Sequence, residues 1–454
     1  MLATLLLGLQ VAAVPPAVQG VHLVLEVRPQ LAAGTLQGRA VLTLANPGPD
    51  PASSVLLLLN RLLEVEAVRD PATGGGLPFS QEVRGRDGFE RMQLRHVRVD
   101  LPRPLAPGGR TRLEVTYRGW LAPYTETGMR YVQDHVDPGF TLLRADAAAF
   151  PWPAGASSDF TWSASVWVPP GQVVASGGRT SEPVPDGDLL RWDAVSRGPV
   201  PFLLIAIAPY HTVRRGGLAV HHFPEDSVGA RRLADRVERG LEVMARWFGP
   251  LGSAAELTIM EIPDGWGSQA SLTAGIIQTA PAFQETARLG EVYHELTHLW
   301  NAPDLDRPSP RWNEGLATFL QARLAAELDG ADLEGALDGL LARLRDRLER
   351  SRTLERVPFR DFGRERRTDD AYLLGGVFFA LLYAQMGEAA FDAAYGGLWR
   401  ARGAVGVSTD DLVRAFAERD PSVAPLFDTW FETPRWTEQV RAATRFADLP
   451  GARP

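Results

Sequence analysis

Two short motifs and the connector between them limit most strongly which structure this chain can adopt. Residues 294–298 read H-E-L-T-H and residues 313–315 read N-E-G. Apolar residues at helical spacing around the first motif predict a helix from Gln284 to Asn301. Residues four apart on a helix lie on one face, so His294 and His298 can offer two imidazoles to one metal ion. The spacing therefore predicts a metal site on a helix.

Two glutamates complete this predicted site. A second helix is expected to begin near Pro310, with Glu314 one turn in. Two histidines and one glutamate form the ligand set of an open catalytic zinc site, so we expect one Zn²⁺ per chain on His294, His298 and Glu314. Glu295 can then deprotonate a metal-bound water. The alternative is a pair of helical histidines that bind neighbouring side chains, with Glu295 in solvent.

The two motifs, HELTHLW and WNEGLATFL, resemble those of the gluzincin aminopeptidases, the group with membrane alanyl aminopeptidase and leukotriene A4 hydrolase. The resemblance implies zinc at His294, His298 and Glu314 and a general base at Glu295. It also implies an α+β fold, in which an antiparallel β saddle or sandwich precedes a thermolysin-like, mostly helical catalytic domain. That family usually has eighteen residues between its second histidine and its ligand glutamate, whereas this chain has the fifteen residues 299–313.

A tyrosine lies in a second segment that is similar to the family. Residues 370–379, DAYLLGGVFF, resemble the family's Tyr-x-Lys-Gly-Ala segment, with Leu374 in place of the lysine. The resemblance implies that Tyr372 donates a hydrogen bond to the oxyanion of the tetrahedral intermediate, which is a strongly stabilising contact in comparable sites. The alternative is an aromatic side chain packed at the start of a helix.

The family's amine-binding motif is absent. Where the family has Gly-Ala-Met-Glu-Asn, residues 269–273 read QASLT, so that Leu272 replaces the glutamate that binds the substrate amine. The family's other acidic anchor falls near Leu142, and Asp146 is the nearby carboxylate. An ammonium group buried without a carboxylate is costly. The resemblance thus implies peptide substrates but leaves aminopeptidase and endopeptidase activity open.

Composition narrows the class of partner. The 454 residues are 45% hydrophobic, enough for two or three domains with cores. A net charge of −8 argues against nucleic acid or an anionic membrane surface as the main partner. The chain has no cysteine, so nitrogen and oxygen atoms must hold the zinc.

The first residues suggest export. Residues 1–19 are expected to be a signal segment, since a short apolar run ends in the small residues Ala12 and Ala13. No lysine or arginine precedes this run, and the run is too short to span a bilayer. We expect a periplasmic or extracellular protein. If the segment is instead a buried first strand, or if the start is misassigned, the protein would be cytoplasmic. No other segment is apolar for long enough to cross a membrane.

Three further regions are expected. Alternating apolar and polar residues predict a β domain over residues 20–209, with strands at 21–27, 36–44, 91–101, 110–117, 160–168 and 201–209. Residues 210–441 should form the catalytic domain, which turns helical after Pro250, with helices at 332–352, 372–386, 388–401, 409–419 and 423–431. A strand at 272–279 should be the edge for a substrate backbone. Residues 442–454 are expected to be a tail.

Three functions remain open at this point. The first is an exported zinc peptidase, and the second is another zinc hydrolase on the same frame, such as an epoxide hydrolase or endopeptidase. The third is a catalytically silent surface-binding protein that keeps the fold. Intact His294, Glu295, His298, Glu314 and Tyr372 argue against the third.

Overall fold

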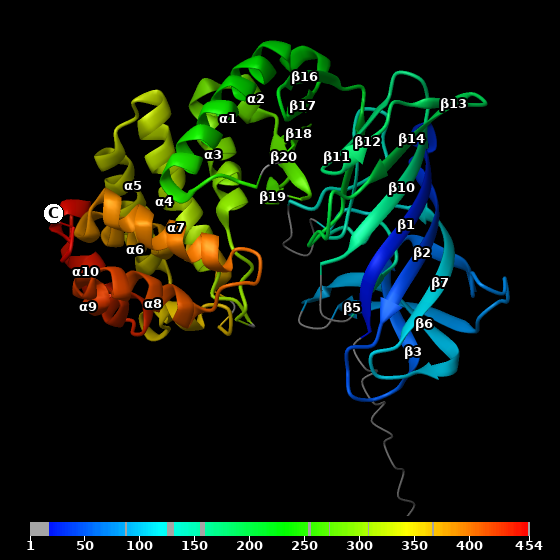
Figure 1. Ribbon diagram of the computed structural model, residues 1–454, viewed down its shortest axis with the longest axis horizontal. Coiled ribbons are helices and arrows are strands. Elements are labelled where there is room, and N and C mark those ends of the chain that lie inside the picture. The colour runs from blue at the N-terminus through cyan, green and yellow to red at the C-terminus, as the bar shows by residue number, and fades with distance from the viewer. Residues whose placement is uncertain are drawn as a thin grey trace, which may run out of the picture. The chain divides into compact units, whose positions relative to one another are not determined.

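The computed structural model describes residues 18–86, 89–124, 131–154, 159–252, 256–271, 273–306, 308–365 and 367–452. The chain divides into two units (Figure 1). The first, called the β unit, contains the described residues up to Tyr210 together with Gly265–Gly267. The second, called the helical unit, contains the other described residues from His211 onward. The expected signal segment lies outside the described residues, except for Val18 and Gln19, where β1 begins.

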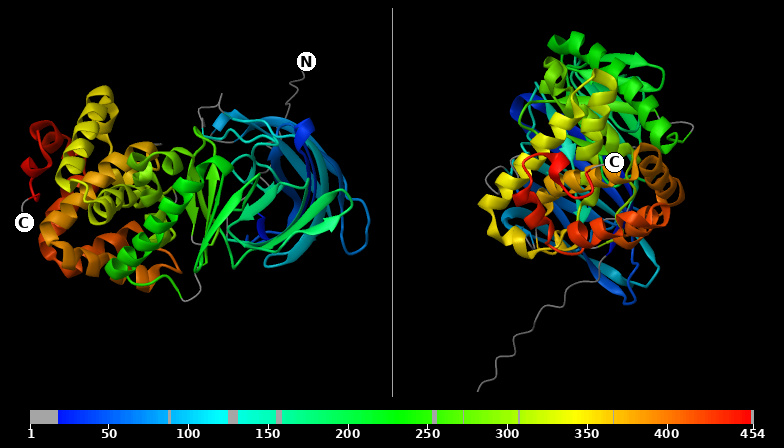
Figure 2. Two further views of the ribbon diagram at one scale, coloured as in Figure 1. Left: turned by 90° about the horizontal axis from the view of Figure 1, so that it is seen from above. Right: turned by 90° about the vertical axis from the view of Figure 1, so that its left-hand side faces the viewer.

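Three sheets make up the β unit. The largest has the order β12-β14-β10-β1-β2-β7-β4, with β13 beside β14, and its strands are strongly curved (Figure 2). The smaller sheets have the orders β5-β6-β3-β9 and β11-β15-β8. The bounds are β1 Gln19–Gln30, β2 Thr35–Ala45, β3 Ala52–Asn60, β4 Leu63–Arg69, β5 Phe79–Arg86, β6 Phe89–Leu105, β7 Arg110–Trp120, β8 Thr141–Arg144, β9 Trp152–Pro153, β10 Thr161–Val168, β11 Val173–Ser176, β12 Arg179–Thr180, β13 Val184–Asp186, β14 Leu189–Val195 and β15 Leu204–Ala208.

Alternating burial explains why these segments form sheets. In β2, for example, Leu36, Ala40, Leu42 and Leu44 are fully buried, and they pack into one apolar core with the other sheets of the unit. The predicted fold class, a β domain followed by a mostly helical domain, is confirmed. One pairing differs from the antiparallel expectation, because β1 and β10 run parallel. A parallel pair needs a long crossover, and here the chain from β2 to β9 supplies it.

A five-stranded sheet opens the helical unit, in the order β16-β17-β18-β20-β19. Its three central strands are parallel, and β16 and β19 pair with them in the antiparallel sense at the edges. The bounds are β16 His211–Arg215, β17 Leu218–His222, β18 Leu257–Ile262, β19 Gln269–Ser271 and β20 Gly275–Thr279. The strand expected over residues 272–279 corresponds to β20. Its expected place at the edge is wrong, because β20 pairs with β18 on one side and with β19 on the other, and β19 is the edge strand. Leu272 lies outside the described residues.

The helices of this unit share one apolar core with the sheet. Helix α4 packs against α3, α5 and α6. The bounds are α1 Ser227–Phe248, α2 Pro281–Gln284, α3 Leu289–Thr297, α4 Trp312–Asp329, α5 Leu333–Arg350, α6 Ala371–Met386, α7 Glu388–Arg402, α8 Thr409–Arg419, α9 Ala424–Leu426 and α10 Trp436–Ala442. None of the helices in the described part of the chain combines the length and apolar character that crossing a membrane requires.

Several elements differ from their sequence-based expectation. Helix α1 precedes Pro250, the point after which helices were expected. The helix expected over residues 284–301 is broken at Glu285, where the backbone is extended, so that α3 begins only at Leu289 and ends in the 3-10 turn His298–Trp300. The segment expected to be a helix over residues 423–431 consists of α9 and the π-helical turn Phe427–Phe431.

Among the last described residues, Phe446 and Leu449 belong to the core of the helical unit. They were expected to be a tail, but Phe446 is 5% and Leu449 2% exposed, and both join the apolar cluster of this unit. The backbone N–H of Phe446 also donates to Asp338 on α5 at 2.6 Å.

Candidate metal centre

Helix α3 presents both motif histidines on one side. Its buried face contains Leu289, Val292 and Leu296, which pack into the core. His294 and His298 lie on the opposite side, with side chains 14% and 12% exposed. Their Nε2 atoms are 3.2 Å apart, and their ring planes are nearly perpendicular at 87°. The two nitrogens therefore converge as the helical spacing predicts.

Helix α4 adds the carboxylate. Oε2 of Glu314 lies 3.5 Å from Nε2 of His294 and 3.3 Å from Nε2 of His298. Four ligands on a tetrahedral zinc at about 2.0–2.1 Å are spaced by roughly 3.3 Å, so this triangle has the size that the ion needs. Within the described residues, Oε2 is buried without a hydrogen-bond partner. The same residues are the one group of three or more potential metal ligands found across the described ranges.

Neighbouring polar groups orient the ligands. The amide of Asn301 approaches Nδ1 of His298 at 2.6 Å, which leaves Nε2 of that ring for the centre. Nη2 of Arg311 donates to Oε1 of Glu314 at 2.8 Å, so the other carboxylate oxygen, Oε2, faces the histidines. Metal ligands in proteins are commonly oriented in this way by outer hydrogen bonds.

The two glutamates differ in their electrostatics. Burial alone would raise the pKa of Glu314, but the imidazoles of His294 and His298 and the guanidinium of Arg311 outweigh it and hold the pKa well below its usual range. For Glu295, which is 8% exposed, burial raises the pKa to about 7, with the charges of Glu314 and Glu291 adding to it and His294 opposing. A carboxyl with a pKa near neutrality suits a group that accepts and returns a proton.

Tyr372 joins the centre from the first turn of α6. Its ring stacks on His294 with 5.8 Å between centroids and 18° between planes. Its hydroxyl oxygen accepts a hydrogen bond from Nη2 of Arg311 at 2.8 Å. Burial raises the pKa of this phenol well above its usual range, and the charge of Glu314 adds to the effect, so Tyr372 keeps its proton. The side chain is thus a neutral donor beside the three ligands.

A close approach of two helices places Tyr372 opposite Glu314. A Cβ on Gly315 of α4 would lie 2.4 Å from Cα of Gly375 on α6, and one on Gly375 would lie 2.7 Å from Cα of Gly315. Only hydrogen atoms at these two positions let the helices come so near, as is usual where glycines face each other. The glycines therefore set the distance between the ligand helix and the tyrosine helix.

The structure thus brings together all five residues that the sequence predicts for the site: His294, Glu295, His298, Glu314 and Tyr372. Sequence reasoning missed Arg311, which contacts both Glu314 and Tyr372. Its position three residues before Glu314 was a usable signal, because side chains three apart would meet on the helix that was expected to begin near Pro310.

Three residues were considered for binding the substrate amine, namely Leu272, Leu142 and Asp146. Leu272 lies outside the described residues. Leu142 is fully buried on β8 of the β unit and has no charge to offer. Asp146 belongs to the same unit, where burial raises the pKa of Asp134 and the charge of Asp146 adds to this effect. Asp134 is itself held by Arg144, which donates from Nη2 at 2.9 Å.

The two adjacent histidines of β17 are bonded separately. Nδ1 of His221 lies 3.0 Å from Oγ1 of Thr212, and Nδ1 of His222 lies 2.7 Å from the carbonyl oxygen of Phe223. Neither is among the potential metal ligands in the described ranges.

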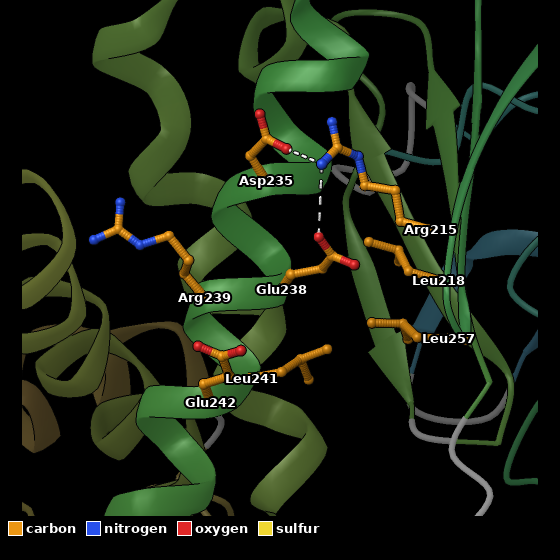
Figure 3. Close-up of a pocket in the computed structure, with 9 residues that line it drawn as sticks. Arg215, Leu218, Asp235, Glu238, Arg239, Leu241, Glu242 and Leu257 are labelled. Atoms are coloured by element: carbon orange, nitrogen blue, oxygen red, sulfur yellow. Dashed lines mark ion pairs between the residues drawn. The ribbon is translucent and has the colours of Figure 1, made fainter.

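A separate pocket of about 530 Å³ lies between α1 and the strands β16, β17 and β18 (Figure 3). Arg215 lines this pocket and forms ion pairs with Asp235 and Glu238 of α1. None of the predicted site residues lines this pocket.

Comparison with known proteins gives structural matches alone. No protein-family model and no curated protein matches the chain in sequence. The M1 zinc metallopeptidase of Deinococcus radiodurans matches with a TM-score of 0.63 and 22% identity over 94% of both chains. Its glutamate-to-alanine variant bound to a Tyr-Ser-Ala substrate matches with a TM-score of 0.64 and 23% identity, over 91% of this chain and 94% of that one.

A glutamate-to-alanine variant of a two-domain M1 zinc metallopeptidase bound to L-tryptophan matches with a TM-score of 0.62 and 23% identity, over 91% of this chain and 94% of that chain. These similarities show that the chain has the two-domain fold of such peptidases, as the resemblance of its motifs implied.

Proposed function

We propose that this protein is a zinc-dependent peptidase, with His294, His298 and Glu314 as zinc ligands and Glu295 as the general base. The observation that carries the proposal is the convergence of two imidazole nitrogens and one carboxylate oxygen, with spacings of 3.2, 3.3 and 3.5 Å, beside a buried glutamate and a tyrosine. The fold shared with zinc metallopeptidases supports it. When zinc is bound, it supplies Lewis-acid activation of a water molecule.

Residues of the chain transfer the proton, contact the oxyanion and orient the ligands. Glu295, a buried carboxyl beside the three ligands, accepts a proton from the attacking water and returns that proton to the leaving amine. Tyr372 keeps its proton and donates a hydrogen bond to the oxygen of the scissile carbonyl as negative charge develops there. Arg311 and Asn301 hold Glu314 and His298 in orientation.

We further propose that the site gains little from a free substrate amine. With Leu272 where the resembled family has a glutamate, a charge-assisted hydrogen bond to an ammonium group is lost. Such a bond is worth about 1.5–3 kcal/mol, or roughly ten- to a hundredfold in affinity. Endopeptidase activity is therefore the second candidate, and we expect weak hydrolysis of simple aminoacyl reporters relative to longer peptides.

The test compares kcat/KM for matched peptides with a free and an acetylated N-terminus. We expect similar values for the two members of each pair, loss of both with a chelator and recovery with added zinc. Glu295→Gln serves as the control that separates this enzyme from a contaminating peptidase. A strong preference for the free amine that disappears in Asp146→Ala would establish an aminopeptidase with Asp146 as its anchor. No hydrolysis of any peptide by the zinc-loaded protein would contradict the proposed function.

A further inference from the structure

One arginine beside the centre has a strained backbone and two important contacts. Arg311 has φ 56° and ψ 36°, in the left-handed region, directly before α4. Within the described residues, Ala148 is the other residue besides glycine with positive φ. A side chain longer than hydrogen disfavours this conformation, and it persists where the surroundings fix it.

The connector that leads into α4 fixes this conformation. The backbone N–H of Arg311 donates to Oγ of Ser309 at 3.0 Å, and that hydroxyl donates to Asp304 at 2.5 Å. The carbonyl of Arg311 accepts from the N–H of Glu314 at 3.1 Å, so the residue also starts the helix. Both sides of the peptide are therefore held, and the guanidinium is directed toward the centre.

A single nitrogen of Arg311 donates hydrogen bonds to both Glu314 and Tyr372. Nη2 donates one bond to Oε1 of Glu314 and one to the hydroxyl oxygen of Tyr372, each at 2.8 Å. Nη2 carries two hydrogens, and these two bonds use both of them. Nη1 lies 3.6 Å from Asp369, whose side chain is 94% exposed, so this second ion pair is in solvent and contributes little.

These bonds have separate consequences for the two neighbours. Because Oε1 of Glu314 is occupied, Oε2 is the oxygen that faces His294 and His298. Because Arg311 only donates, the hydroxyl oxygen of Tyr372 accepts this bond with a lone pair, so the bond to Arg311 does not use the hydroxyl hydrogen. A planar guanidinium fixes both directions at once, which a lysine ammonium on a flexible stem does less well.

We propose that Arg311 is a positioning residue that couples the zinc ligand Glu314 to the oxyanion donor Tyr372. This inference rests on the proposed function. An ordinary surface pair three residues apart on a helix would affect stability slightly and nothing else. The coupling predicts effects on zinc affinity and on the contribution of Tyr372.

The experiment compares Arg311→Met and Arg311→Lys with the control Arg414→Met. Arg414 also forms an ion pair over three residues, with Asp411 of α8 at 3.4 Å, and that carboxylate is 16% exposed against 17% for Glu314. Zinc affinity is measured by competition with a chelator, the stability of the zinc-free protein by its Tm, and kcat and KM with an acetylated peptide.

We expect Arg311→Met to raise the Kd for zinc by about 10- to 100-fold, which is the usual cost of losing an outer hydrogen bond to a ligand. Its kcat should fall more than its KM rises. Tyr372→Phe should lower kcat much less in the Arg311→Met background than in the natural chain, because coupled residues are not additive. Arg311→Lys should have a Kd for zinc and a kcat between those of the wild type and Arg311→Met. Arg414→Met should change neither the Kd for zinc nor kcat.

Unchanged zinc affinity in Arg311→Met, or independent effects of Arg311→Met and Tyr372→Phe on kcat, would overturn the inference. If Arg311→Met does not fold, Arg311→Lys carries the same comparison. A wild-type protein that binds zinc without cleaving peptides would refute the proposed function, while the zinc affinities still test Arg311. A wild-type protein that binds no zinc would overturn both.

Discussion

Glu314, whose side chain is 17% exposed, and Glu261, which is fully buried, are both carboxylates of the helical unit, yet their surroundings favour opposite charge states. Glu314 faces two imidazoles and a guanidinium, which hold its pKa well below the usual range despite burial. Glu261, on β18, is fully buried beside other acids. Burial first, then its hydrogen bond with Asp226 and the charges of Asp226 and Glu225, raise its pKa to about 9. The partners of a buried acid therefore decide its chemistry.

Glu295 lies between these two cases. Burial and the charges of Glu314 and Glu291 raise its pKa to about 7, and no arginine is among the groups that act on it. The metal centre thus contains one glutamate that stays ionised and one that can exchange a proton. Glu261 contributes a third state, a neutral carboxyl in the sheet.

The largest effect is expected for Glu295→Gln. The amide has the shape of the glutamate but cannot accept the proton, so kcat should fall by roughly 10³–10⁴-fold, the upper range for one acid–base group. Zinc content should stay as in the wild type, because Glu295 is not a ligand. Glu285→Gln, at an exposed glutamate shortly before α3, is the control and should change kcat little. Retained activity in Glu295→Gln would exclude Glu295 as the base.

Tyr372→Phe should have the next largest effect. Loss of one oxyanion donor lowers kcat by about 10²–10³-fold, while zinc content and KM stay nearly constant. Tyr383→Phe on the same helix is the control, since Tyr383 packs against Phe319 and Phe391. Steady-state kinetics on one peptide checks both variants. Equal kcat for Tyr372→Phe and the wild type would show that Tyr372 packs in the structure and does not contribute to catalysis.

Gly375→Ala tests the geometry that joins the two sides of the centre. Its Cβ would lie 2.7 Å from Cα of Gly315, so α4 and α6 must separate. Overpacking of this kind costs about 1–3 kcal/mol of unfolding free energy, and kcat should fall with it. Gly397→Ala, in α7, is the control, because its Cβ would meet nothing within 4 Å. Denaturant unfolding of both variants gives the comparison, and equal stabilities would show that the close approach is not needed.

Glu261→Gln should have a smaller, pH-dependent effect. The pKa is about 9 in the folded protein against 4.5 for the ordinary carboxyl, so the folded state binds the proton more tightly. Glu261 therefore stabilises fully below about pH 4.5, and this contribution is lost as pH rises to about 9. Glutamine does not titrate, so the Tm of the variant minus that of the wild type should increase from pH 5 to pH 9. A constant difference would show that Glu261 is ionised throughout.

Much of the metal centre could be predicted because its signals are local or shared with a known family. His294, His298 and Glu314 follow from helical spacing in two short segments. Tyr372 came from a resemblance, since nothing in the periodicity distinguishes it from a packed aromatic residue. Arg311 was missed because its contact with Tyr372 spans 61 positions of the chain and its left-handed backbone depends on the fold of the connector.

The fold was predicted in outline. Alternation in the β unit gave most of its long strands, but the parallel pairing of β1 and β10 depends on tertiary contacts. Helix α1 was missed although its buried residues Leu233, Val237, Met244 and Trp247 follow helical spacing. Its many charged residues lie on the other face and mask this stripe. Glu261 could not be identified, because only the folded sheet shows that a glutamate in an apolar strand is fully buried.

The most direct test of the account is the zinc content of the purified chain and of Glu314→Ala after the same dialysis, measured by elemental analysis. We expect about one zinc per wild-type chain, since two imidazoles and one carboxylate form the site. Glu314→Ala should lose most of this zinc while its Tm shows that it is folded. A wild-type chain without zinc, or full zinc occupancy in Glu314→Ala, would contradict the proposed zinc site on His294, His298 and Glu314.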